Sequence, residues 1–431
     1  MTVIDVQAGS QASQRNKNDK PSFLKMSIFM SQRYPTCIPI LRTPLALAMT
    51  TALATALSFS AISVAHAQAP AGDASRTITI GIAGPLTGPS ARIGKDLENG
   101  AQLAIDDANA THPMLDGKPV HFALLSVDDA SDPRTAVTVA QQLVDQHVVG
   151  VVGHWNTGAS IPASRIYHAA GIPEIAPAST GHQYTLQGYN TAFRIMGHDD
   201  LSGAITGAYA VKTLKGKHIG VIDDRSAFGA GLATQFIKGV EANGGKIVDH
   251  EYVDANTIDF SSVLTTLKEK RVDVLFFGGL DTEEAQVARR MKQLGIKATL
   301  LGAGGTSHTF VQLAGSAAEG VVALEPGRPL DLMPGGAAFD KAYRAKYHHP
   351  IELHAPFAYD AAATIIAAVE KTQSTDPAKL TAEVHAISRP GVTGTISFDA
   401  EGNLRNPAFT IFKVVNGEWK VEKLLGGDKA H

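Results

Sequence analysis

Short apolar runs alternate with amphipathic stretches along most of the chain. The first clear unit begins at Thr77, where the β-branched run ITIGIAG leads into a Gly/Pro loop and then into KDLENGAQLAIDDANA, whose apolar positions recur at helical spacing. The same order returns with VHFALLSVDDA and TAVTVAQQLVDQ, and again over residues 148–170 and 171–187. Such alternation predicts a parallel sheet covered by helices on both faces, with ligands at the carboxyl ends of the strands.

A second block of alternating elements starts after residue 195. HIGVIDD predicts a strand, residues 225–231 a Gly-rich loop, and LATQFIKGVEANGG a helix that ends at glycine. Further on, AFDKAYRAKYH and AYDAAATIIAAVEKT predict two helices. The tail changes to period-2 runs with turn signals at residues 401–403 and 416–417, which is typical of antiparallel strands. The pattern therefore predicts two α/β domains.

Two of the strands in the first block end in small hydroxyl-bearing residues, one crossover apart. The apolar run that ends at residue 152 gives way to GHWNTG, and the run over 171–177 gives way to AST. Hydroxyls and backbone N–H groups at helix starts suit a small anion, because helix N-termini carry unsatisfied donors and partial positive charge. The alternative is that Thr157, Ser179 and Thr180 are ordinary helix N-caps.

The N-terminal region has the pattern of an export signal. Residues 44–64 form an uncharged, largely apolar stretch, and Ala65-His66-Ala67 fits a small-x-small cleavage site. We therefore expect residues 1–67 to be a leader and signal peptide that is cleaved after Ala67; a membrane anchor is the alternative. The single cysteine, Cys37, lies in this leader, so the mature chain is expected to have no disulfide.

Charge and motifs argue against nucleic-acid binding and catalysis. The net charge is −3, acids and bases are interspersed, and the sequence contains neither a GxxxxGK[ST] phosphate loop nor a GxSxG elbow. The closest histidines, His348, His349 and His354, lack metal-ligand spacing and are expected on the surface. The acid pairs at 128–129 and 223–224 could serve acid/base chemistry but are expected to cap turns. We predict no enzyme activity, cofactor or metal.

Several segments occur in the order found in a known family, namely IAGPLTGPSARIGKDLENGAQLAIDDAN, VDDASDPRTAV, VVGHWNTGASIPAS, IPEIAPAST and LFFGG. From about Thr77 to Trp419 the chain resembles periplasmic solute-binding proteins of ABC importers, of the branched-chain amino acid (leucine/isoleucine/valine) type. The resemblance implies two doubly wound, parallel-sheet α/β lobes of the type I periplasmic binding fold. A three-stranded hinge joins them, and they close on a ligand in the cleft between them.

The resemblance also implies domain boundaries. The three crossovers are expected near residues 196–200, 325–330 and 391–395. Lobe 1 would then comprise residues 76–197 and 328–393, and lobe 2 residues 198–327 and 394–431.

The resemblance further implies which first-lobe residues contact the ligand. They are Thr157, Ala178, Ser179, Thr180, Trp155 and Ile93. Thr157 stands where the family places a hydroxyl on the ligand carboxylate, and residues 178–180 stand where it holds the carboxylate and the ammonium. Trp155 and Ile93 would border the ligand side chain.

Three second-lobe positions depart from the family pattern. Phe228 replaces a tyrosine, Leu280 replaces another aromatic hydroxyl, and Gly304 stands where an acidic residue meets the ligand ammonium. A buried ammonium without a carboxylate partner is costly. Either Asp281 substitutes from the adjacent position, or the ligand carries a carboxylate but no amine.

The sequence therefore predicts a non-enzymatic periplasmic protein that binds a branched-chain amino acid or similar small carboxylate-bearing ligand. It would deliver this ligand to an ABC permease in the inner membrane, act as a monomer and bind no nucleic acid. Two alternatives stay open, a binder of amine-free aromatic or aliphatic acids and a ligand sensor for a membrane receptor.

Overall fold

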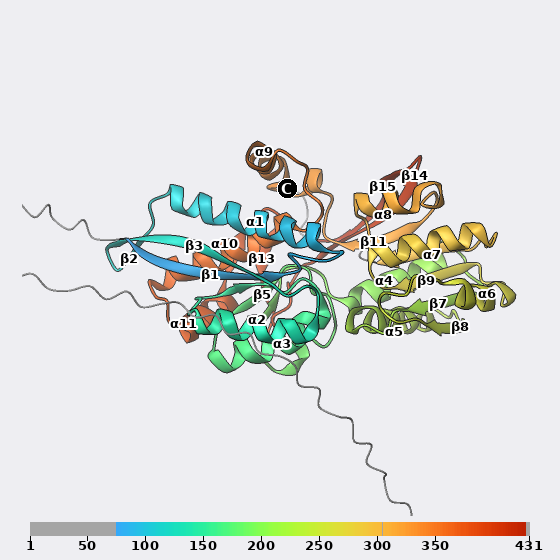
Figure 1. Cartoon of the computed structure of the whole chain (residues 1–431), viewed down its shortest axis with the longest axis horizontal. Helices are drawn as coiled ribbons and strands as arrows, with labels where there is room; N and C mark the ends of the chain where they lie inside the picture. The colour runs from blue at the N-terminus through green and yellow to red at the C-terminus, as the bar shows by residue number, and fades with distance from the viewer. Residues whose placement is uncertain (1–74, 304, 428–431) are drawn as a thin grey trace, which may run out of the picture. The chain divides into compact units, whose positions relative to one another are not determined.

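Two open sheets organise the chain (Figure 1). The structure is a computed structural model that describes residues 75–303 and 305–427. The predicted signal peptide, its cleavage after Ala67 and the predicted site residue Gly304 lie outside the described residues. Within those two described ranges, no helix is long and apolar enough to cross a membrane.

The first sheet is parallel except at its edge strand and has the order β2-β3-β1-β4-β5-β6. Its strands are β1 (Arg76–Gly84), β2 (Met114–Leu115), β3 (Lys118–Asp128), β4 (Val151–Val152), β5 (Glu174–Ala176) and β6 (Ala192–Arg194). The helices of this half are α1 (Ala91–Ala110), α2 (Pro133–Asp145), α3 (Thr157–Ala170), α9 (Gly336–Tyr347), α10 (Ala355–Thr372) and α11 (Pro377–Ala386). We call this sheet and its helices the first lobe.

The second sheet has the order β15-β14-β11-β10-β9-β7-β8. Its strands are β7 (Ile219–Asp223), β8 (Ile247–Tyr252), β9 (Val274–Gly278), β10 (Thr299–Ala303), β11 (Val322–Pro326), β14 (Ala408–Val415) and β15 (Glu418–Gly426). The β11–β14 and β14–β15 pairs are antiparallel, as the period-2 tail predicted, and the other pairs of this sheet are parallel. The helices of this second lobe are α4 (Asp199–Lys212), α5 (Ala227–Ala242), α6 (Ser261–Glu269), α7 (Asp281–Gln293) and α8 (His308–Ala314).

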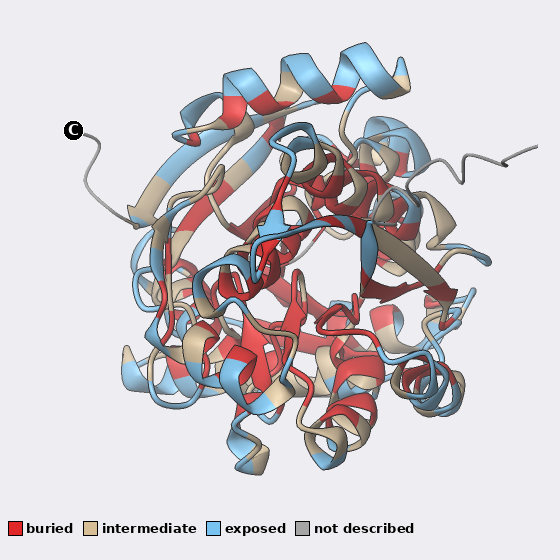
Figure 2. Cartoon of the chain, turned by 90° about the vertical axis from the view of Figure 1, so that its left-hand side faces the viewer, coloured by how far each residue is buried: buried red, intermediate tan, exposed pale blue. Residues whose placement is uncertain are grey.

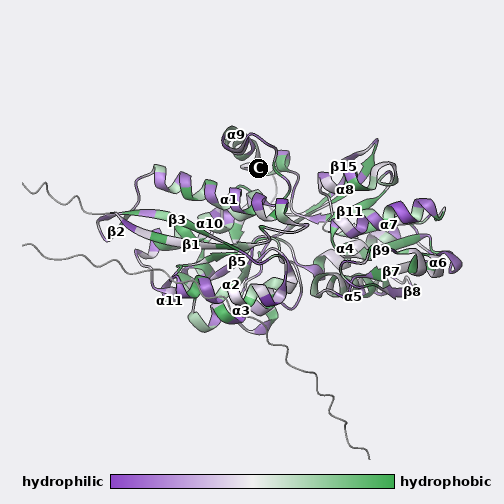
Figure 3. Ribbon diagram, viewed as in Figure 1, coloured by the Kyte–Doolittle hydropathy of each residue, from purple (hydrophilic) through white to green (hydrophobic). Residues whose placement is uncertain are grey.

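Helices cover both faces of each sheet, so the predicted doubly wound fold is confirmed. In the second lobe, Leu275 and Phe277 pack in one core cluster with residues of α6, α7 and α8. Val274 and Phe276 pack in another with residues of α4 and α5. This alternation follows from the period of two along a strand, which sends neighbouring side chains to opposite faces. Figures 2 and 3 show buried and hydrophobic residues concentrated on the strands and inner helix faces.

Backbone contact between glycine-bearing helices fixes the α4–α5 pair. A Cβ on Gly203 or Gly207 of α4 would lie 2.3 or 2.4 Å from backbone atoms of α5, and one on Gly239 would lie 2.2 Å from the Gly203 carbonyl oxygen. Side chains at these positions would force the helices apart, because real Cβ atoms do not approach so closely.

Contacts of residues 394–404 bear on the position of the third chain crossover. Ile396 and Phe398 are buried in the core of the first lobe, and Asn403 forms a β-bridge with Arg194 of β6. The chain then enters the second sheet at β14. Residues 394–404 therefore pack with the first lobe, and we propose a crossover at residues 404–408 in place of 391–395.

Two local predictions need correction. Residues 225–231 were expected to be a loop, but α5 begins at Ala227 because the Ser226 hydroxyl accepts the Gly229 N–H at 2.9 Å. A helix was expected after β5, but Ala178 to Gly181 continue as irregular backbone into a single 3-10 turn, η1 (Thr185–Gln187).

Candidate functional site

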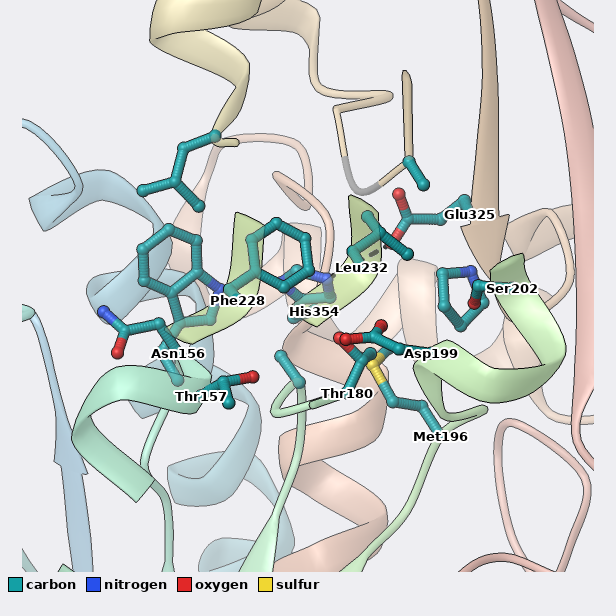
Figure 4. A pocket seen from close by; sticks show the side chains of 15 residues that line it. Asn156, Thr157, Thr180, Met196, Asp199, Ser202, Phe228, Leu232, Glu325 and His354 are labelled. Carbon is teal, nitrogen blue, oxygen red and sulfur yellow. Dashed lines mark ion pairs between the residues drawn. The ribbon is translucent and has the colours of Figure 1, made fainter. Parts of the chain in front are cut away.

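A cavity that is partly open to solvent is lined by residues that follow strands of both sheets (Figure 4). Most of the wall is apolar, and the polar lining residues are Asn156, Thr157, Thr180, Asp199, Ser202, Glu325 and His354. The cavity therefore combines an apolar surface with a few convergent polar groups, as ligand pockets do.

The cavity brings together some of the residues selected from the sequence. Those in its wall are Trp155, Thr157, Ala178, Thr180, Phe228 and Leu280. Ile93 and Ser179 do not line it; Ile93 lies in the first-lobe core and Ser179 is fully buried. The predicted residues that do line the wall come from both lobes.

Thr157 does not cap α3, so the N-cap alternative is wrong for this residue. The cap is Asn156, whose side chain accepts the Ala159 N–H at 2.8 Å. Thr157 is buried, and its hydroxyl oxygen accepts the Gly181 N–H at 3.0 Å. Since the oxygen is engaged as an acceptor, the hydroxyl proton is left to donate to a group in the cavity.

A buried arginine shapes the loop that carries Ala178, Ser179 and Thr180. Arg194 donates to the carbonyl oxygens of Ser179 and Gly181 at 3.2 and 2.9 Å, and to the Thr185 hydroxyl at 2.9 Å. Burial lowers the pKa of Arg194 to about 10, so it stays a cation at neutral pH. These three hydrogen bonds from Arg194, and not the expected helix start, hold this part of the site in place. In the sequence, Arg194 stands out only as a lone Arg inside the apolar run AFRIM.

Glu325 and His354 form a buried pair in the cavity wall, which sequence reasoning did not find. Their side chains lie 3.5 Å apart between His354 Nε2 and Glu325 Oε1, and the residues are 6% and 7% exposed respectively (Figure 4). The expectation that His354 is a surface histidine is wrong. Asp96 of α1 accepts the backbone N–H groups of residues 352–355 at 2.8 to 3.0 Å, which anchors the start of α10 in the interior.

Asp199 is a second buried carboxylate in the wall, only 1% exposed. Burial raises its pKa to about 6, against the opposing effects of the Thr180 hydroxyl and the Arg194 guanidinium. Figure 4 shows this carboxylate pointing into the space between Thr180 and His354. At pH 7 it is therefore mostly ionised.

Asp281 is committed to other partners. Its carboxylate accepts from Arg92 at 2.8 Å and from the Ser307 hydroxyl at 2.5 Å, and it does not line the cavity. Arg92 also pairs with Glu352 at 2.7 Å. These contacts link α1 of the first lobe with α7 of the second, beside Leu280.

The acid pairs found in the sequence hold turns in the structure. No group of three or more His, Cys, Asp or Glu residues within them could hold a metal ion. Asp128 accepts the N–H groups of Leu86 and Ala130, and Asp223 accepts that of Arg225, as expected for turn-capping acids.

Comparison with known proteins adds family information to this geometry. Residues 77–418 match the family model described as periplasmic binding protein. The leucine-, isoleucine-, valine-, threonine- and alanine-binding protein of Pseudomonas aeruginosa is 34% identical over 341 residues, covering 79% of this chain and 90% of that protein. The Leu/Ile/Val-binding protein homolog 1 of Brucella abortus is 33% identical, covering 83% and 96%.

A solved structure shows the same architecture. The branched-chain amino acid transporter substrate-binding protein LivJ from Streptococcus pneumoniae, in complex with isoleucine, has a TM-score of 0.73 and 28% identity. The match covers 81% of this chain and 99% of that one.

Proposed function

Because the chain belongs to the periplasmic binding protein family, we propose that it is the substrate-binding component of an ABC importer and delivers a small apolar amino acid to the permease. Members of this family bind solutes and are not enzymes. Relatives named for binding leucine, isoleucine and valine make branched-chain amino acids the first candidates, and the family supports a periplasmic location.

The observation that carries this proposal is the composition of the cavity. The first-lobe hydroxyl groups, Thr157 and Thr180, suit a carboxylate, and Trp155, Phe228 and Leu280 offer an apolar surface for a hydrocarbon side chain. No lining residue within the described part of the chain is Lys or Arg, so the ligand carboxylate would depend on hydroxyl and N–H donors.

Lobe closure follows from the way the wall is shared. Thr157 and Thr180 come from the first lobe, whereas Phe228, Leu280 and Glu325 come from the second. A ligand that contacts both sets gains its full binding energy only when the lobes are together, so binding shifts the population toward the closed form. That form would be the one recognised by the permease.

A thermal-shift screen of the mature protein, residues 68–431, tests this function. Leucine, isoleucine, valine and the matched acids without the amine would be compared, since a ligand in large excess over its Kd must raise the Tm. We expect stabilisation by at least one amino acid, and calorimetry then gives its affinity. If no compound in either set stabilises the protein, the proposal fails.

Genetics separates transport from sensing. Deletion of the gene is expected to abolish high-affinity uptake of the labelled ligand. Normal uptake with an altered transcriptional or chemotactic response would instead indicate a sensor.

A further inference from the structure

The described part of the cavity wall is acidic, although the buried Arg194 guanidinium outside it offsets part of the charge of Asp199. Asp199 and Glu325 both line it and are at least nine-tenths buried, and no lining residue among those described is Lys or Arg. Burying ionised carboxylates is costly unless a cation or several hydrogen bonds compensate them. The charge of this wall therefore bears on the chemical class of the ligand.

Among the described residues, Glu325 has only two weak side-chain partners. Its Oε2 accepts from the Thr306 hydroxyl at 3.2 Å, and its Oε1 is 3.5 Å from His354 Nε2, which is long for a hydrogen bond. Glu325 therefore has acceptor capacity left for a ligand.

Asp199 provides an independent sign of a missing donor. Its Oδ2 is buried and meets no donor at hydrogen-bond distance and angle within the described residues, although the Thr180 hydroxyl and the Arg194 guanidinium lie close enough to oppose the rise in its pKa. Buried polar atoms of folded proteins are almost always hydrogen-bonded, so an exception in a cavity wall points to a donor carried by a ligand.

Ligand charge decides between the two chemical classes left open by the sequence. An acid without an amine would place a third negative charge beside two buried carboxylates, and like charges at such a site repel strongly. An α-amino acid instead brings an ammonium group with three donors next to its carboxylate. Its positive charge offsets the burial of the acidic wall.

We propose that Glu325 binds the ligand ammonium, with Asp199 flanking it, so that this site selects zwitterionic amino acids over amine-free acids. This inference rests on the proposed function and specifies its ligand class. In the related family an acidic residue at the position of Gly304 binds the ligand ammonium. Here Glu325, on β11, would take that role. Asp281 cannot take this part without giving up Arg92 and Ser307.

The position of Glu325 also connects recognition to the hinge. It is the penultimate residue of β11, directly before the chain crosses toward α9 of the first lobe, and its side chain faces His354 of that lobe. An ammonium bound here contacts the crossover itself, so the charged group of the ligand acts on the segment about which the lobes move.

The test pairs one substitution in the protein with one deletion in the ligand. Affinities for leucine and for 4-methylpentanoate, which is leucine without its amine, would be measured by calorimetry for the wild type and for Glu325→Gln. Glu319→Gln is the matched control, because Glu319 is exposed and lies before the other end of β11. Glu325→Asp keeps the charge and serves as the conservative variant.

We expect the wild type to prefer leucine. Glu325→Gln should bind leucine about 30-fold more weakly or worse, with unchanged or improved affinity for 4-methylpentanoate, because truncating a buried charge partner typically costs about that much. Glu325→Asp should give an intermediate ratio of the two affinities, and Glu319→Gln the wild-type ratio. Each ratio is measured within one variant, so a general loss of stability does not imitate this result.

Three outcomes would overturn the inference. If the wild type binds 4-methylpentanoate more tightly than leucine, the inference is wrong but the proposed function stands. If Glu325→Gln keeps the wild-type ratio of the two affinities, the inference is also wrong. If that variant does not fold, an unchanged ratio in Glu325→Asp contradicts the inference in its place. A wild type that binds neither compound ends both proposals.

Discussion

At the scale of single residues, one hydroxyl group joins the two loops that form the first-lobe side of the site. Thr157 accepts the Gly181 N–H, and a Cβ on Gly181 would lie 2.2 Å from the Thr157 methyl carbon. The loop at residue 181 therefore packs directly on Thr157. The same hydroxyl that holds the loop has its proton available for a ligand carboxylate.

Replacement of Thr157 by valine is expected to weaken ligand binding by about 1–3 kcal/mol, because it removes a donor to a charged group and leaves the Gly181 N–H without its acceptor. Calorimetry with the best ligand from the thermal-shift screen measures the loss. Thr157→Ser retains the hydroxyl and should bind within about threefold of the wild type. Equal affinities for the valine variant and the wild type would remove Thr157 from the site.

Sequence reasoning reached only the residues close to strand ends. Trp155, Thr157, Ala178 and Thr180 follow β4 and β5 directly, so the strand pattern and the resemblance located them together. His354 could not be found in this way. Its burial depends on Asp96, more than 250 positions earlier, which collects the N–H groups at the start of α10.

At the scale of elements, α1 and α7 are joined by an ion pair across the lobes. Arg92 lies 2.8 Å from Asp281 of α7 and 2.7 Å from Glu352, with all three side chains 13 to 30% exposed. Partly exposed pairs contribute little to stability on their own. Because this pair connects the two lobes, its contribution appears in the closed form rather than within either lobe.

Arg92→Met is therefore expected to weaken ligand binding about 3- to 10-fold, mainly through faster dissociation, with little change in the Tm of the ligand-free protein. Stopped-flow measurements at low and high salt test this, since screening should weaken the wild type more than the variant. Arg344→Met is the control, because Arg344 pairs with Asp340 inside α9 alone. If both variants dissociate at the same rate, the inter-lobe pair has no part in closure.

At the scale of the whole molecule, folding changes the protonation of buried acids. Burial raises the pKa of Glu284 to about 8, with Asp281 and Glu325 adding to the effect, and raises the pKa of Glu174 well above its ordinary value. An unfolded glutamate loses its proton near pH 4.5. Between that value and 8, Glu284 binds more protons in the folded state than in the unfolded state, so its contribution to stability falls as the pH rises.

Glu284→Gln should flatten this dependence. Denaturant unfolding of the ligand-free protein between pH 4.5 and 8 is expected to give a wild-type free energy that declines with pH and a smaller decline in the variant. Exposed Glu319 provides the control, and Glu319→Gln should retain the wild-type slope. A variant slope as steep as that of the wild type would show that Glu284 titrates normally in the folded protein.

The fold class was predictable, because the alternation of strands and helices indicates parallel sheets with helices on both faces. The third crossover was not. Ile396 and Phe398 lie in a period-2 tail whose later strands belong to the second sheet, and only their burial in the first-lobe core separates them from it. Periodicity identifies a strand but does not say which sheet it joins.

The glycine contact between α4 and α5 offers a route by which ligand specificity can change without substitution of any residue in the cavity wall. Asp199 and Ser202 of α4 and Phe228 and Leu232 of α5 all face the ligand space, so the spacing of the two helices determines its width. An alanine at Gly203 would widen that spacing from outside the site. Divergent relatives could thus acquire larger substrates through mutations that comparisons of wall residues alone would overlook.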